Sequence, residues 1–335
     1  MYLPAQIHIG FARELNHGPI PMPSLDSIQI PYSIMADIIA PLPLIFTQKT
    51  SIQYTIDDFV LIRELGRGSF GEILLVENKI DRSSLVLKRL FKRRASVQDI
   101  TNEIIILERL QSICDDYILC YRGYFQDDQY YYIITEFLGN YITLQEYIDG
   151  KINSRDLLRI IQNLILGLER IHNAEIAHRD IKPDNILINP NTNEIKYIDF
   201  GLSCYGNQCT TRKIDVGTVP YMPPEILTGI VKANLNALQK GDIWSLSMTI
   251  FTMICGKTFA EGCAQMKDPQ GNYTIYSLLY LLSRVYSKWY QDGYPVLNEL
   301  LNSSPYGGRI QRLVSLMVEI DPQKRDLSQM SKLVT

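Results

Sequence analysis

The chain has 335 residues, of which 46% are hydrophobic and 21% are charged. This composition is typical of a folded protein with room for about two domains, and it excludes a disordered, collagen-like or disulfide-stapled miniature chain. With 33 Lys and Arg against 36 Asp and Glu, the net charge of −3 is too balanced for a protein whose main task is to bind nucleic acid or an anionic membrane.

The first 55 residues differ from the rest of the chain. They hold seven of the 16 prolines and few charged residues, which indicates a proline-rich extension rather than a domain. Their apolar content is too high for a solvated tail, so we expect part of the extension to pack on the body of the protein or on a partner. The apolar stretch Ser27–Phe46 is interrupted by three prolines and by Asp37, so no membrane span is expected.

The cysteines and the start of the chain indicate a compartment. Met1–Gly10 contains no Lys or Arg, unlike a secretory signal. The six cysteines form no Cys-x-x-Cys pair and the chain has four His, so neither a zinc site nor a redox dithiol is predicted. We therefore expect reduced thiols in an intracellular, cytoplasmic protein.

From Tyr54 onward the sequence pattern is strand-like. Three runs separated by glycine-rich or polar turns predict an antiparallel sheet: Phe59–Leu65, Ile73–Glu77 and Ser84–Arg89. Apolar residues then recur at helical spacing from Val97 to Leu107, behind a Ser-x-x-Asp capping signal at Ser96 and Asp99. Tyr130–Glu136 predicts another strand.

After Gly139 the pattern becomes helical. Apolar residues from Leu157 to Ile171 form one wide helix face. We therefore divide the body near Gly139, with a smaller, sheet-rich lobe over residues 56–138 and a larger, helical lobe over residues 139–335.

A glycine-rich motif joins the first two predicted strands. Gly66-Arg67-Gly68-Ser69-Phe70-Gly71 matches G-x-G-x-x-G, and its position between two strands predicts a hairpin rather than a dinucleotide-binding turn. Glycines at such a tip let backbone N–H groups approach phosphate oxygens with no Cβ in the way. Taken alone, the motif is as consistent with an ordinary flexible hairpin.

Two further blocks decide between these interpretations. His178-Arg179-Asp180-Ile181-Lys182-Pro183-Asp184-Asn185 is followed by Asp199-Phe200-Gly201, and with them the sequence resembles the eukaryotic protein kinase family over about residues 56–335. The blocks supply a carboxylate for an incoming hydroxyl, a Lys for the moving phosphoryl group, and Asn and Asp oxygens for magnesium. The resemblance implies an α+β bilobal fold, with a small antiparallel sheet lobe carrying one helix and a large, mainly helical lobe, that binds ATP and Mg²⁺.

The resemblance also assigns roles to single residues. Asp180 matches the catalytic base or hydroxyl-orienting group, and Lys182 the phosphate-stabilising cation. Asn185 and Asp199 match the magnesium ligands. His178 matches a residue that packs against the Phe of Asp-Phe-Gly, so we expect it to be structural.

Other matched positions lie in the smaller lobe and at its junction with the larger one. Lys88 resembles the strand lysine that contacts the α- and β-phosphates, and Glu103 resembles its helix partner. The family pattern puts the adenine between a roof of Ile73 and Val86 and a floor of Leu187, with backbone groups of Glu136 and Leu138 bonding the base edge. Val86 replaces the usual alanine and narrows this pocket.

The segment Gly217-Thr218-Val219-Pro220-Tyr221-Met222-Pro223-Pro224-Glu225 is similar to the motif that closes the activation segment of the family, with Pro223 where alanine is usual. Thr218 together with Lys182 is the family's signature of serine/threonine specificity. Glu225 is expected to form a buried ion pair with Arg325.

Two further expectations concern the helical lobe. Asp242 resembles the helix aspartate that holds the His-Arg-Asp backbone. Arg179 suggests a basic pocket for a phosphate on Thr210 or Thr211, and a loop ordered without modification is the open alternative.

The sequence therefore predicts a kinase that transfers the γ-phosphoryl group of ATP to Ser/Thr hydroxyls of protein substrates. A pseudokinase scaffold would be favoured if Lys88, Asp180 or Asp199 were absent, and all three are present. A small-molecule kinase of the aminoglycoside type lacks the segment that ends in Pro-Pro-Glu. Substrate choice is expected within residues 257–309, as loops at 268–273 and 303–308 around a helix at 275–290.

Overall fold

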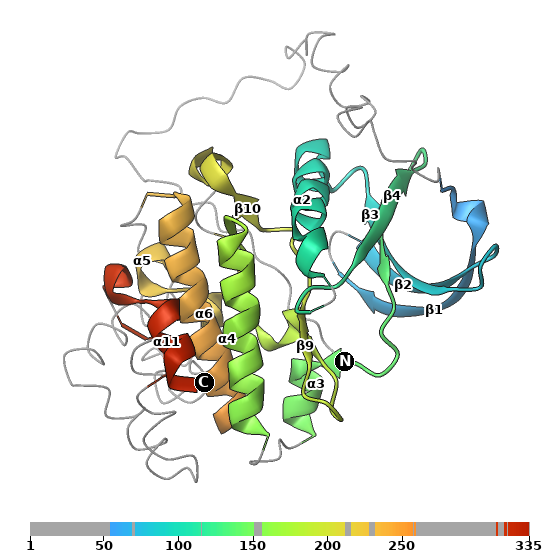
Figure 1. Cartoon of the computed structure of the whole chain (residues 1–335). Helices are drawn as coiled ribbons and strands as arrows, with labels where there is room; N and C mark the ends of the chain where they lie inside the picture. The colour runs from blue at the N-terminus through green and yellow to red at the C-terminus, as the bar shows by residue number, and fades with distance from the viewer. Residues whose placement is uncertain are drawn as a thin grey trace, which may run out of the picture. The chain divides into compact units, whose positions relative to one another are not determined.

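The computed structural model describes residues 54–68, 71–114, 116–150, 156–211, 216–227, 232–256, 258, 313, 318–319 and 321–334 (Figure 1). They all belong to one compact unit. The predictions for the N-terminal extension, for Ser69 and Phe70, and for residues 268–273, 275–290 and 303–308 lie outside the described residues.

A five-stranded antiparallel sheet forms one part of this unit, in the order β1-β2-β3-β5-β4. Its strands are β1 Phe59–Arg67, β2 Gly71–Asn78, β3 Ser84–Phe91, β4 Tyr121–Gln126 and β5 Tyr130–Glu136, preceded by the 3-10 turn η2 Ile56–Asp58. The four strands predicted from the sequence are confirmed, and the first three run up to two residues longer at either end.

The two faces of the sheet differ because side chains alternate along each strand. One face carries an apolar core of Phe59, Leu74, Val76, Leu85, Leu87, Phe125, Tyr132 and Ile134. The Phe125 ring stacks on Phe59 at 5.8 Å and on Tyr132 at 4.3 Å between ring centroids. The other face carries Ile73 and Val86, and Lys88 lies directly opposite Ile73.

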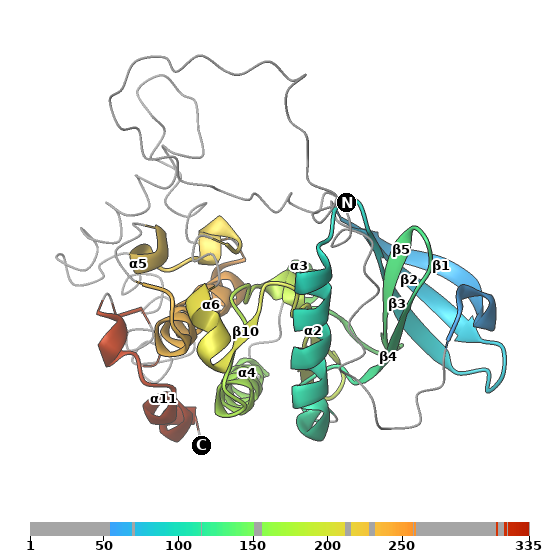
Figure 2. The ribbon, with the colours of Figure 1, turned by 90° about the horizontal axis from the view of Figure 1, so that it is seen from above.

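Helix α2 (Val97–Arg109) follows β3, and the 3-10 turn η3 (Leu110–Ile113) continues it. Its predicted cap is confirmed, since the Ser96 hydroxyl accepts a hydrogen bond from the Asp99 backbone N–H at 3.1 Å. Ile104 and Ile106 are completely buried. Seen from above, α2 lies between the sheet and the helical part (Figure 2), so a shift of α2 would change its packing against both of them.

The helical part contains α3 Leu144–Asp149, α4 Leu157–Asn173, α5 Pro224–Leu227, α6 Leu235–Cys255 and α11 Leu327–Val334. The predicted wide apolar face of α4 is confirmed, with Ile161, Leu164 and Leu168 completely buried. In α6 every residue from 241 to 253 is buried, including Trp244 and Phe251, which makes it the central helix of this part. No helix within the described residues is long and apolar enough to cross a membrane.

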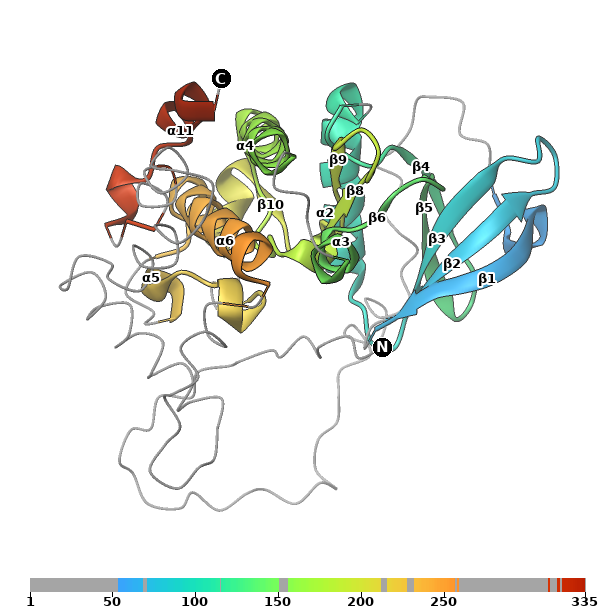
Figure 3. The same cartoon turned by 90° about the horizontal axis from the view of Figure 1, so that it is seen from below.

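Short strands and turns lie among and beside these helices (Figure 3). They are β6 Ile142–Thr143, β7 Ile176–Ala177, η4 Pro183–Asn185, β8 Ile186–Ile188, β9 Ile195–Tyr197, β10 Cys204–Tyr205, η5 Gly206–Thr211, η6 Val219–Tyr221 and η7 Pro322–Lys324. β6, β8 and β9 form one small sheet, and β7 pairs with β10. The residues between β7 and β10 include both sequence blocks that suggested a kinase.

The expectation of reduced thiols is wrong for four of the cysteines. Disulfides join Cys114 to Cys120 and Cys204 to Cys209. The sequence test looked for Cys-x-x-Cys, whereas these pairs are separated by six and five positions. Folding brings their Cα atoms to 4.7 Å and 5.2 Å, a spacing that a disulfide spans.

Candidate active site

Asp180, Lys182 and Thr218 form a closed triangle of hydrogen bonds. The Lys182 ammonium donates to Asp180 Oδ2 at 2.9 Å and to the Thr218 hydroxyl at 2.8 Å. The Thr218 hydroxyl donates to Asp180 Oδ1 at 2.7 Å. Because Asp180 and Lys182 are both buried, these bonds are shielded from water and hold three polar groups in one arrangement.

Local structure explains how these groups meet. Lys182 is extended, and Pro183 starts the turn η4, which brings Asn185 back toward the carboxylate. The Asn185 amide nitrogen donates to the Asp180 backbone carbonyl and to its Oδ2, both at 2.8 Å. Thr218 comes from the start of η6, far along the chain, so the triangle exists only when the activation segment is folded.

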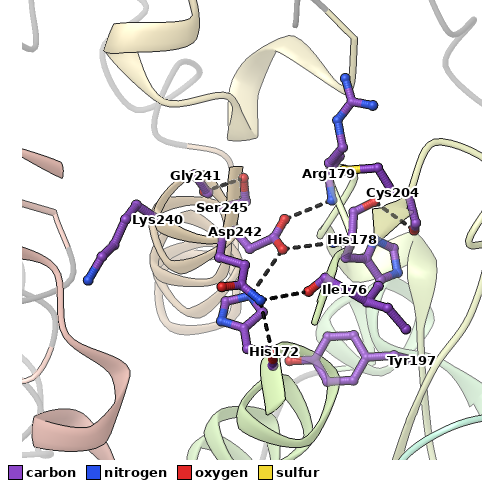
Figure 4. Close-up of polar contacts among 12 residues, drawn as sticks. His172, Ile176, His178, Arg179, Tyr197, Cys204, Lys240, Gly241, Asp242 and Ser245 are labelled. Carbon is purple, nitrogen blue, oxygen red and sulfur yellow. Dashed lines mark hydrogen bonds and ion pairs between the residues drawn. The ribbon is translucent and has the colours of Figure 1, made fainter. Parts of the chain in front are cut away.

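A buried carboxylate on α6 fixes the backbone before Asp180 (Figure 4). Asp242 accepts hydrogen bonds from the His178 and Arg179 backbone N–H groups, each at 2.7 Å, and lies 3.1 Å from the His172 ring nitrogen. Arg179 has a φ of 71°, a left-handed conformation that non-glycine residues seldom adopt. The predicted supporting role of Asp242 is thereby confirmed.

His178 has the surroundings of a packing residue, as predicted. Its side chain is completely buried, and its ring centroid lies 4.9 Å from that of Phe200. One ring nitrogen lies 3.1 Å from the Ile198 carbonyl oxygen.

Lys88 lies between two carboxylates. Its ammonium donates to Glu103 of α2 at 2.6 Å and to Asp199 at 2.8 Å. Burial alone would lower the pKa of Lys88, but the charges of Asp199 and Glu103 outweigh it and the pKa is raised. Lys88 is therefore a permanent cation that links the sheet, α2 and the Asp199 turn.

The pKa values of the two carboxylates, Asp199 and Glu103, are shifted in opposite directions. The charge of Lys88 lowers the pKa of Asp199 to about 2, so Asp199 is ionised at every physiological pH. Burial raises the pKa of Glu103 above its usual value, and Lys88 partly offsets this effect.

The donor set fits a hard cation such as Mg²⁺. Asp199 offers an ionised carboxylate that is 34% exposed. The two bonds from the Asn185 amide nitrogen to Asp180 fix that amide, and its oxygen is the kind of ligand that magnesium takes. A φ of 61° at Asp199 is the second left-handed backbone at this site.

The predicted adenine pocket residues are half-buried. Ile73 and Val86 share a face of the sheet, and Leu187 is on β8. Glu136 ends β5, and its N–H donates to the Cys120 carbonyl at 3.0 Å. The Leu138 carbonyl accepts from Tyr141 N–H at 3.1 Å.

The glycines of the hairpin have different surroundings. A Cβ at Gly66 or Gly68 would meet no atom within 4 Å, which is open space of the kind that a phosphate chain needs. A Cβ at Gly71 would lie 1.9 Å from the Arg89 carbonyl oxygen, so Gly71 is required by strand packing. The Arg67 guanidinium pairs with Glu64 and Glu72 at 2.8 and 2.9 Å.

The activation segment is tied to the helical part by the predicted ion pair. Arg325, completely buried, donates to both carboxylate oxygens of Glu225, at 2.6 and 2.9 Å.

The Arg179 guanidinium donates to the Leu202 carbonyl at 3.0 Å. Thr210 and Thr211 are exposed, and their hydroxyls donate to backbone carbonyls within η5.

Sequence reasoning missed several contacts around this site. Glu72 is buried beside Arg89, which donates to it at 2.8 Å. Opposite charges at facing positions of two neighbouring strands were the available signal. Asn102, which donates to the Ser203 carbonyl at 2.9 Å, gave no such signal.

Comparison with known proteins identifies the family that the sequence motifs resemble. Residues 59–332 match the protein kinase domain. Calcium-dependent protein kinase 4 of Plasmodium berghei is 30% identical over 222 residues, which cover 64% of this chain and 40% of that protein. Aurora kinase of Dictyostelium discoideum is 33% identical over 208 residues (62% and 52%), and serine/threonine-protein kinase PSK1 of Saccharomyces cerevisiae is 31% identical over 210 residues (59% and 15%). The matches thus span about half or less of each of these relatives. With its antiparallel sheet lobe and helical lobe, the chain belongs to the eukaryotic-type protein kinase family and has the bilobal kinase fold.

Proposed function

We propose that this chain is an ATP-dependent serine/threonine protein kinase, which transfers the γ-phosphoryl group of ATP to a Ser or Thr hydroxyl of a protein substrate. The observation that carries the proposal is the triangle of Asp180, Lys182 and Thr218, whose polar atoms lie within 2.9 Å of one another. Relatives named as serine/threonine kinases support the same reaction class.

Asp180 orients the substrate hydroxyl. Three side-chain hydrogen bonds from described residues reach its carboxylate, and a carboxylate has about four acceptor positions. A hydroxyl that donates to the carboxylate has its oxygen lone pair directed away from Asp180, toward the phosphorus. The proton stays on the hydroxyl oxygen, hydrogen-bonded to Asp180, until the phosphoryl group has moved.

Two cations face the phosphates. Lys88 would contact the α- and β-phosphates, since it is already held in place by Glu103 and Asp199. Lys182 would balance the charge on the moving phosphoryl group beside Asp180. The hairpin Gly66–Gly71, including Arg67, Ser69 and Phe70, would cover the phosphate chain with backbone N–H groups.

Asn185 and Asp199 would hold magnesium, which when bound supplies positive charge to the β- and γ-phosphates. Ile73, Val86 and Leu187 would enclose the adenine, and the Glu136 and Leu138 backbone would bond its edge. We propose Thr218 as the residue that favours Ser and Thr acceptors, because it closes the triangle with Lys182.

We further propose a cytoplasmic location, where ATP and magnesium are available.

Thr210 and Thr211 are the proposed acceptors of an activating phosphate. Residues 1–55 are proposed to pack on the kinase or on a protein partner, and an unchanged melting temperature and association state after deletion of residues 1–50 would contradict this.

Transfer of label from [γ-³²P]ATP to degenerate peptide libraries tests the proposal. One library offers Ser and Thr, and a second offers Tyr. We expect labelling of the first library, reduced by about 10²-fold or more in Asp180→Asn. Labelling no higher than in Asp180→Asn would remove the kinase proposal, and labelling of the tyrosine library would remove the serine/threonine specificity.

A further inference from the structure

A disulfide closes a short loop at the start of the activation segment. Cys204 lies in β10 and Cys209 in η5, five positions apart, and both are completely buried. Cys204 follows Gly201 of the Asp-Phe-Gly block by three positions. The catalytic roles proposed above do not use this pair.

One side of this loop contacts the strand that leads into the catalytic residues. Cys204 pairs with Ala177 of β7, and Gly206 N–H donates to the Glu175 carbonyl at 2.9 Å. The Ser203 hydroxyl donates to the His178 carbonyl at 2.9 Å. Figure 4 shows Cys204 beside His178, so the position of the loop and that of the His-Arg-Asp backbone are linked.

The other side contacts α2. The Asn102 amide donates to the Ser203 carbonyl at 2.9 Å in a buried position. The Arg109 guanidinium lies 4.2 Å from the centre of the Tyr205 ring, which is cation–π distance. Since α2 also carries Glu103, the stretch 203–205 connects α2 to the catalytic loop, and through Glu103 to Lys88.

We infer that Cys204–Cys209 is a reversible thiol–disulfide site whose co-reactant is a dithiol, and that its oxidation state sets kinase activity. The disulfide limits the conformations of the loop, and therefore favours the arrangement in which Ser203 and Tyr205 contact α2. Reduction removes this restriction, and α2 with Glu103 is then held less firmly. The effect on activity rests on the proposed kinase function, whereas the coupling of the disulfide to α2 does not.

The exchange balances as a two-electron transfer. A thiolate of the dithiol attacks one sulfur of the pair, the Cys204–Cys209 bond breaks, and a mixed disulfide forms. The second thiol of the reagent then displaces the protein sulfur, which leaves two protein thiols and an oxidised cyclic reagent. Both sulfurs are buried, so attack requires local opening of η5, whose Asn207, Gln208, Thr210 and Thr211 are exposed.

Peptide phosphorylation by the full chain, before and after treatment with dithiothreitol, tests the inference. We expect kcat to fall by about fivefold to tenfold on reduction and to recover on reoxidation by a small-molecule disulfide such as oxidised glutathione, which is itself reduced to two thiols. The change should follow the alkylation of Cys204 and Cys209 measured by mass spectrometry. The double variant Cys204→Ala/Cys209→Ala should have the low kcat in both conditions. The matched variant Cys114→Ala/Cys120→Ala, which lacks the other disulfide, should keep its response.

Two outcomes would overturn the inference. One is a kcat that does not change when both sulfurs are alkylated, and the other is a response that persists in Cys204→Ala/Cys209→Ala. If the chain phosphorylates no peptide in either state, the kinase proposal fails by itself. Hydrogen exchange of residues 97–109 then decides the inference: faster exchange after reduction supports it, and equal exchange contradicts it. That measurement also decides the case in which the alanine variants fail to fold.

Discussion

Buried charges at single positions hold the catalytic region of this kinase together. Asp242 is 1% exposed and accepts two backbone N–H bonds from a stretch that contains a left-handed residue, Arg179. These bonds lower the free energy of a backbone path that would otherwise be strained. The position of Asp180 thus depends on a carboxylate that never contacts substrate.

The Glu225–Arg325 ion pair gives a prediction for stability. Arg325→Ala removes a completely buried guanidinium and leaves the Glu225 carboxylate, which is 8% exposed, without its bidentate partner. We expect the free energy of unfolding to fall by about 3–5 kcal/mol, measured by urea denaturation. The double variant Glu225→Ala/Arg325→Ala should be destabilised by less than the sum of the two single variants, and additivity would contradict a coupled pair.

Thr218 gives a prediction for catalysis. Thr218→Val keeps the shape of the side chain but removes the hydroxyl that bonds both Asp180 and Lys182. We expect kcat to fall about tenfold, which corresponds to about 1.4 kcal/mol, while KM for ATP changes by less than about twofold. Thr218→Ser is the matched control and should retain most activity. An altered KM with unchanged kcat would contradict a role in the triangle.

At the scale of elements, a buried charge network connects the glycine-rich hairpin to β3. Glu72 is 6% exposed and pairs with Arg67 at 2.9 Å and with Arg89, the neighbour of Lys88. The Arg89 guanidinium also lies 5.0 Å from the centre of the Tyr130 ring. The hairpin is therefore attached to β3 at its base, through Glu72.

Glu72→Gln tests this attachment. The amide cannot balance two guanidinium charges, so we expect the hairpin to be held less firmly and KM for ATP to rise about threefold to tenfold with little change in kcat. Glu77→Gln is the matched control, because Glu77 lies on the same strand and pairs with Arg82, which is 73% exposed. Equal effects of the two substitutions would contradict the prediction.

The elements also show which features could be predicted from the sequence. The strands and α2 with its Ser96 cap follow from periodicity and from local capping chemistry, and the ion pair of Glu225 follows from the resemblance to the kinase family. The disulfides could not be predicted in this way, because each one forms only when folding brings two cysteines close together. Cys114 lies at the end of η3 and Cys209 lies within η5. The Asn102–Ser203 bond likewise joins residues about 100 positions apart, which no local pattern encodes.

At the scale of the whole kinase unit, the loop after α2 joins the sheet to the helical part. The Tyr197 N–H on β9 donates to the Tyr117 carbonyl at 2.8 Å, and the buried Lys196 ammonium donates to the Cys114 carbonyl at 2.8 Å. The Cys120 N–H donates to the Glu136 carboxylate at 2.9 Å. The Glu136 N–H in turn donates to the Cys120 carbonyl at 3.0 Å, so this loop holds the end of β5, the strand proposed to contact adenine.

Binding of ATP with magnesium should therefore stabilise the whole unit. At a free concentration of about 100 Kd, a ligand that binds only the folded state contributes about 2.7 kcal/mol, or an increase in melting temperature of about 5 °C for a unit of this size. Differential scanning fluorimetry measures this shift. In Asp199→Asn, we expect the additional shift due to magnesium to be lost while a small shift from ATP alone remains.

The pH dependence of that magnesium effect follows from Asp199. Its pKa is lowered from 3.8 to about 2 in the folded state by the Lys88 charge, so folding favours the ionised carboxylate. Its contribution to stability is complete above about pH 5 and is lost as the pH falls toward 2. The magnesium-dependent shift should consequently be the same at about pH 7 and pH 8, where the terminal phosphate of ATP, with a second pKa of about 6, is also ionised. A shift that disappears at the lower of these values, or persists unchanged in Asp199→Asn, would mean that magnesium is held by other groups.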